Sequence, residues 1–202
     1  MQRAFCLAAL FTLLSGPSMQ LAHADEPAKP AAAEAVPLSE QQLKQLLARV
    51  HDAGFYGLRD PEEAKAIAEL RKHPDQAAPE LTKMLAEGHK NRKQGWIWIY
   101  RPMYIIEGMG PAAKVAVPEI AKALNDDHGI NVSQSAKLLT QIGPDAKEAM
   151  PALMKAWEKA EASTLDARRK QLQKNTLAKA MLAIDPEAAK QAGAAVVDDE
   201  EE

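Results

Sequence analysis

Four proline-containing junctions recur along this chain and constrain its fold more than any other feature. Each junction begins with a proline, at positions 74, 111, 144 and 186, so the periods are 37, 33 and 42 residues. A second proline follows the first three at spacings of 5, 7 and 7 residues, as Pro79, Pro118 and Pro151. Self-similarity at such a period is typical of proteins built from stacked supersecondary units.

Each junction separates two segments with helical spacing of apolar residues. Proline suits the first turn of a helix, so the first proline and the glycine or histidine before it mark a helix end, and the second proline marks the next helix start. Spacings of three and four place apolar side chains on one helix face. The expected core residues are Met103, Ile105, Ile106 and Met109, then Ala136, Leu138, Leu139 and Ile142, then Ala178, Ala180, Met181 and Ile184. We therefore expect almost no strand, Pro118 and Pro151 in the first turn of their helices, and a positive φ at Gly143.

The residues before the first junction predict two further helices. Ser39 and Gln42 form a capping box, and Asp60 precedes a proline in the first helical turn. The expected inward residues are Leu43, Leu46, Leu47 and Val50 in the first helix, and Ile67 and Leu70 in the second. These helices are interpreted as an N-terminal cap.

The junctions resemble the HEAT-repeat family, in particular the short HEAT-like repeats named after phycobilisome lyases. The matching residues are Gly110, Ala113, Ala116, Pro118, Ile120, Leu139 and Ile142 in one unit, and Gly143, Ala146, Ala149, Pro151, Leu153, Leu182 and Ile184 in the next. The resemblance covers about residues 60–190. It implies an all-α, right-handed α-solenoid of about three helical pairs, at about 74–109, 110–142 and 143–184, within a repeat domain over 38–197. In that family the second helices line the concave surface.

The first 24 residues have the pattern of a secretory signal peptide. Arg3 precedes an apolar run over 4–14 that is too short to span a membrane, and Ala22-His23-Ala24 is a small-x-small cleavage site. A short membrane anchor is the alternative. Residues 25–37 are rich in alanine, proline and charge and predict a flexible linker. We expect a periplasmic or secreted protein with no stable membrane insertion after cleavage.

Charge and composition exclude several classes of function. Cleavage before Asp25 removes the one cysteine, Cys6, and leaves a net charge of −4, of which the acidic tail 198–202 carries −5. The rest of the mature chain is then nearly neutral, unlike a nucleic-acid-binding surface. The remaining histidines are far apart in sequence, and no His-Glu-x-x-His, Gly-x-Ser-x-Gly or glycine-rich phosphate loop occurs. We expect no catalytic residues, metal or cofactor, and no nucleic-acid partner.

An aromatic stretch before the second junction is the one candidate binding site. When Met109 is aligned with Ile142, the residues Trp98, Arg101 and Tyr104 fall on polar positions of the next unit, so we expect these equivalent positions to form one solvent-reachable stripe. Aromatic residues and arginine are favoured anchors of binding surfaces. The predicted partner-binding residues are Trp98, Arg101 and Tyr104, continued by the equivalent Gln134 and Lys137, and by Thr176 and Lys179. The alternative is that these aromatics pack in the core, under the turn at 87–95 or against the N-terminal helices.

The sequence thus predicts an exported, non-catalytic module that binds or scaffolds another protein or a peptide in the cell envelope. A structural or oligomerising envelope subunit is the alternative. Some relatives of these repeats assist bilin attachment and some act on DNA. The nearly neutral chain and the absence of an acid–base cluster in the sequence disfavour an enzyme or a lyase-like accessory factor.

Cleavage of the predicted signal peptide can be tested by the mass of the exported protein. Protein recovered from the exporting cell is expected to begin at Asp25, because signal peptidases cleave after small residues such as Ala22 and Ala24. Intact-mass spectrometry measures this, and a mass that still includes residues 1–24 would contradict export with cleavage.

Overall fold

The computed structural model describes residues 36–52, 60–91 and 95–196, and all regular secondary structure in these ranges is helical. The prediction of an all-α fold is therefore confirmed. The helices are α1 (Glu40–Asp52), α2 (Pro61–Lys72), α3 (Pro74–Lys90), α4 (Ile97–Ile106), α5 (Val117–Ala123), α6 (Gly129–Ile142), α7 (Met150–Glu161), α8 (Ala167–Ile184) and α9 (Pro186–Gln191), with 3₁₀ segments η3 (Gly110–Ala116) and η4 (Gly143–Ala149). Within the described ranges, no helix is long and apolar enough to cross a membrane.

The two Gly-Pro junctions each form a 3₁₀ segment that leads into an α-helix. Pro118 and Pro151 lie in the first turn of α5 and α7, as predicted. Gly143 has a φ of 71°, and Gly110, at the equivalent position, has a φ of 57°. Both values lie in the left-handed region that side chains with a Cβ rarely adopt, so glycine is required where each preceding helix ends.

The His-Pro junction differs from the other two. The expectation that Pro79 opens a helix is wrong, because α3 already begins at Pro74 and contains Pro79. The shorter spacing of the two prolines leaves no room for a separate 3₁₀ segment. Pro79 is the sixth residue of α3 and lies beyond the N–H groups that lack a partner at a helix start, so it removes one backbone hydrogen bond from the second turn of the helix.

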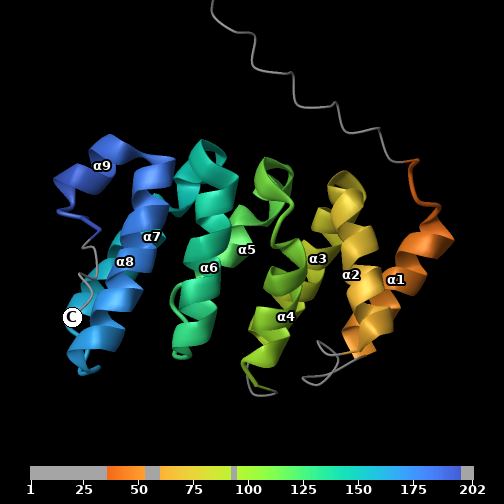
Figure 1. Ribbon diagram of the computed structural model, residues 1–202, viewed down its shortest axis with the longest axis horizontal. Helices are drawn as coiled ribbons and strands as arrows, with labels where there is room; N and C mark the ends of the chain where they lie inside the picture. Colours follow the sequence, from red (N-terminus) through yellow and green to blue (C-terminus); the bar gives the residue numbers. More distant parts are fainter. Residues whose placement is uncertain (1–35, 53–59, 92–94, 197–202) are drawn as a thin grey trace, which may run out of the picture. The chain divides into compact units, whose positions relative to one another are not determined.

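The repeated apolar positions form one continuous core. The sequence predicted twelve buried residues, which lie towards the ends of α4, α6 and α8 or just after α4. The exposed fraction of each is 6 % or less. The helices α2, α4, α6 and α8 pack side by side in chain order (Figure 1), and α3, α5 and α7 pack behind them in the same order. The strand-like sequence of Trp96–Tyr100 lies at the start of α4 and is helical.

The two N-terminal helices have the predicted caps, and a glutamine binds the chain just before α1 to α3. Gln42 N–H donates to Ser39 Oγ at 3.3 Å, and Ser39 N–H donates to Gln42 Oε1 at 2.9 Å. The Gln76 side chain, in α3, accepts from Leu38 N–H and donates to Leu38 C=O, both at 2.9 Å. Val50, Ile67 and Leu70 are buried as predicted, whereas Leu43, Leu46 and Leu47 are half-buried. The first turn of α1 is thereby fixed to the first turn of α3.

A glycine sets the close approach of α3 to α4. A Cβ atom at Gly88 would lie 2.4 Å from the backbone oxygen of Trp98, which is far inside contact distance. Because the obstacle is backbone, it cannot rotate away as a side chain would. Gly88 is therefore needed for packing and not for its conformational freedom.

Replacing this glycine gives a test of the packing. Gly88→Ala should lower the free energy of unfolding by about 1–3 kcal/mol, since the two helices must separate, although alanine normally favours a helix. Gly129→Ala is the matched control in α6, where no atom lies within 4 Å of the added Cβ, and it should be neutral or slightly stabilising. Urea denaturation measures both, and equal stability of Gly88→Ala and wild type would contradict the packing.

Candidate functional site

The predicted binding residues of α4 do not share one surface. An α-helix turns by about 100° per residue, so Trp98 and Tyr104 are about 120° apart around the axis. Trp98 and Arg101 both line a cavity beside α1, where Trp98 is half-buried and Arg101 lies in the protein interior, whereas Tyr104 stacks with another tyrosine. Tyr104 is therefore apart from the other two residues.

The prediction that Arg101 faces solvent is wrong. Its side chain is 3 % exposed and forms an ion pair with Glu63 of α2, which is fully buried. Its Nε also donates to the backbone oxygen of Val50 at 2.5 Å, in the last turn of α1. The last carbonyl groups of a helix have no partner within the helix, so this bond satisfies one of them. Arg101 thus joins α1, α2 and α4.

A feature of α2 could have revealed this pair from the sequence. Glu63 precedes Ala66, Ile67 and Leu70 at the spacing of one helix face, and all three are buried. An acid on the apolar face of a helix needs a buried cation, because an unpaired charge is costly in the interior. The other oxygen of Glu63 has no hydrogen-bond partner in the described part of the chain. Neutralisation of Glu63 therefore depends on Arg101.

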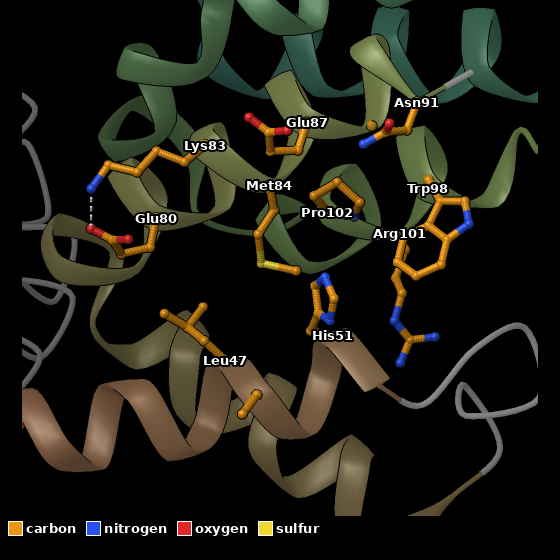
Figure 2. A pocket seen from close by; sticks show the side chains of 12 residues that line it. Leu47, His51, Glu80, Lys83, Met84, Glu87, Asn91, Trp98, Arg101 and Pro102 are labelled. Atoms are coloured by element: carbon orange, nitrogen blue, oxygen red, sulfur yellow. Dashed lines mark hydrogen bonds and ion pairs between the residues drawn. The ribbon is translucent and has the colours of Figure 1, made fainter. Parts of the chain in front are cut away.

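Trp98 forms one wall of a cavity of about 520 Å³ between α1, α3 and α4. The indole is half-buried, and its ring centroid lies 5.5 Å from that of His51 at the end of α1. Figure 2 shows Leu47, Met84 and Pro102 around the same cavity. This volume and this mainly apolar lining are typical of a binding pocket.

Most polar groups of the pocket lie along α3. Glu80 is paired with Lys83 at 2.6 Å and Glu87 with Lys90 at 2.7 Å, so each carboxylate has a cation one helical turn away. The side chains of both lysines are at least 70 % exposed. The pocket therefore has an apolar interior and a solvated edge with little net charge.

Tyr104 belongs to a row of aromatic residues with a spacing of four. Ring centroids are 5.6 Å apart for Trp96 and Tyr100, and 6.1 Å apart for Tyr100 and Tyr104. Arg71 of α2 lies 5.3 Å from the centre of the Tyr104 ring and donates to Tyr104 C=O at 2.6 Å. The i, i+4 spacing, which places neighbours on one helix face, was the signal for this row in the sequence.

Gln134 and Lys137 both bind Glu107 at the end of α4. Gln134 Nε2 donates to Glu107 Oε2 at 3.0 Å, and the Lys137 ammonium pairs with Oε1. Gln134 is 7 % exposed, so its predicted place on an open surface is wrong. Burial alone would raise the pKa of Glu107, but hydrogen bonds from Lys137 and Gln134 and the charge of Lys137 lower it. This network joins α4 to α6.

Thr176 and Lys179 lie on α8. Thr176 Oγ1 donates to Leu172 C=O in its own helix at 2.9 Å, and Lys179 is exposed, with no ion pair in the described ranges.

The seven predicted residues are therefore divided between the pocket, the interior pair, the aromatic row, the Glu107 network and α8. Sequence alignment of the units did not reveal the pocket.

No group of three or more histidine, cysteine, aspartate or glutamate side chains that could hold a metal ion occurs among the described residues. The chain matches no protein-family model, and comparisons with curated proteins and with solved structures give no significant match.

The buried pair gives a prediction for stability. Arg101→Met should cost about 3–5 kcal/mol of unfolding free energy, because it leaves Glu63 charged and unpaired in the interior. The double variant Glu63→Leu/Arg101→Met should recover most of that loss. Chemical denaturation with a double-mutant cycle measures the coupling.

An exposed arginine provides the control for this cycle. Arg49 pairs with Asp60 at 3.9 Å, and both side chains are about half exposed. Arg49→Met should change stability by less than about 1 kcal/mol. Equal losses for Arg49→Met and Arg101→Met would contradict a special role of the buried pair.

Proposed function

We propose that this chain is a non-catalytic binding or scaffolding module of the cell envelope, built as a right-handed α-solenoid of three HEAT-like helical pairs with a two-helix cap. The architecture is supported by equivalent core residues at each repeat and by the ordered packing of α2, α4, α6 and α8. Export to the periplasm or the medium is supported by Arg3, the apolar run over 4–14 and the Ala22–Ala24 site.

The single observation that carries the binding function is the apolar pocket beside Trp98. Its ligand is a protein or peptide that inserts one apolar or aromatic side chain between α1 and α3. A half-buried tryptophan offers a large contact area at little cost in side-chain entropy, and such residues dominate binding energy at interfaces. The thioether of Met84 adapts to the shape of an inserted side chain.

The distribution of polar groups favours a peptide over a polar metabolite. Arg101 lines the pocket, but its guanidinium is paired with Glu63 and bound to the Val50 carbonyl. Glu80, Glu87 and Lys83 lie on the solvated edge. A polar small molecule would find few fixed partners inside, whereas a peptide would place its backbone at this edge and its side chain within.

Peptides selected from a displayed library on the wild-type protein provide the test. Trp98→Ala should raise their Kd about thirtyfold, which corresponds to the roughly 2 kcal/mol of an interface anchor. Isothermal titration calorimetry measures the Kd, and the melting temperature should change little.

Trp157→Ala is the matched control. Trp157 is also half-buried, but it lies on α7 beneath Lys174, whose ammonium is 4.8 Å from the ring centre. Its replacement should leave the Kd unchanged. If Trp98→Ala instead lost about 3–5 kcal/mol of stability and the folded fraction bound normally, Trp98 would be a core residue. Dimerisation that disappears in Trp98→Ala would indicate the oligomerising alternative.

A further inference from the structure

The helix α8 has an unbalanced charge. It contains five basic residues and no acidic residue over eighteen positions, and the basic ones are Arg168, Arg169, Lys170, Lys174 and Lys179. Three of these cations are engaged nearby: Arg169 with Asp166 at 3.4 Å, Lys170 with the Glu161 backbone oxygen at 3.1 Å, and Lys174 with the Glu161 carboxylate. The other two, Arg168 and Lys179, have no ion pair among the residues that the structure describes.

The two remaining cations lie on the same face of α8. They are eleven residues apart, which is close to three full turns, so their side chains leave the helix in nearly the same direction, about 16 Å apart along the axis. Leu172 lies between them on this face and is 62 % exposed. We refer to Arg168, Leu172 and Lys179 as the α8 stripe. It combines two cations with an exposed apolar side chain.

A segment of the same chain has the complementary composition. Residues 198–202 are all acidic and carry five negative charges, and Val197 precedes them. The last described residues are fixed to the helical core, since Ala194 is buried and Val196 packs against it. The helix α9, just before them, packs on α8. Six residues extend to about 20 Å, which is enough to follow the stripe.

We infer that residues 197–202 dock on the α8 stripe of their own chain, with the carboxylates of 198–202 spread between Lys179 and Arg168. The docked segment covers a cationic surface that would otherwise attract acidic partners. An acidic peptide of another protein, or the same segment of a second copy, would have to displace it. The inference does not depend on the pocket beside Trp98.

Zero-length carbodiimide cross-linking of the full chain tests this docking, because it joins lysines only to carboxylates that they contact. At low ionic strength, Lys179 should be linked to a carboxylate within 198–202, as identified by mass spectrometry. The yield should fall severalfold at about 0.5 M salt, where the screening length is roughly 4 Å. Arg168→Gln should lower the yield about threefold, the scale of one exposed ion pair.

Lys114 supplies the matched control, since it is exposed on η3 and has no ion pair among the described residues. Lys114→Gln should leave the Lys179 yield unchanged, and Lys114 itself should give no link to 198–202. Mixed ¹⁴N- and ¹⁵N-labelled chains identify the source of each link. Links only between chains, equal links to Lys114 and Lys179, or no link to Lys179 would each overturn the inference.

Discussion

The buried contact of Arg101 is the interaction on which the arrangement of the N-terminal helices depends. One guanidinium neutralises Glu63 in α2 and satisfies the Val50 carbonyl in the last turn of α1. Neither group can be left alone in the interior, because a buried carboxylate without a cation and a buried carbonyl without a donor are both costly. An apolar side chain at position 101 could pack against these helices, but it could not specify which helix ends meet there. The pair therefore determines position more than it adds net stability.

The pocket follows from how α1 is held. Its start is bound to α3 by the two hydrogen bonds of Gln76, and its end is bound to α4 by Arg101. Between these two attachments, α1 packs mainly on α2 and leaves the cavity towards the second half of α3. Gly88 keeps α3 against the backbone at Trp98, so the opposite wall of the cavity is also fixed. A pocket with both walls held in this way is preformed, which reduces the entropy lost when a ligand binds.

The sequence predicted the helices and the core better than the candidate site, for a physical reason. Buried positions recur with the period of the helix, so a repeat shows them directly, as at Ile106 and its equivalents. Alignment of the units identifies equivalent positions but does not distinguish a polar residue in water from one that binds an internal partner. Arg101 and Gln134 are equivalent and polar, yet both are buried against a glutamate of a neighbouring element. The pocket depends on distances between three helices, and no local spacing encodes these distances.

Equivalent positions show where the units differ in chemistry. The position of Trp98 is occupied by Asn131 in α6 and by Gln173 in α8. Asn131 is buried, and its Nδ2 donates to the Trp96 carbonyl at 3.3 Å. In α6 the side chain is therefore used to join neighbouring helices, whereas in α4 it is an indole on an open cavity. The equivalents of Arg101 also differ in their interactions. Arg101 forms an ion pair, Gln134 in α6 donates from its amide to Glu107, and Thr176 in α8 donates to a carbonyl of its own helix. The apolar positions before the junctions are alike in burial, so the units differ in chemistry mainly at these side chains. In the binding function that we propose, recognition depends on the side chains that differ between equivalent positions, and Trp98 is the largest of them beside the cavity.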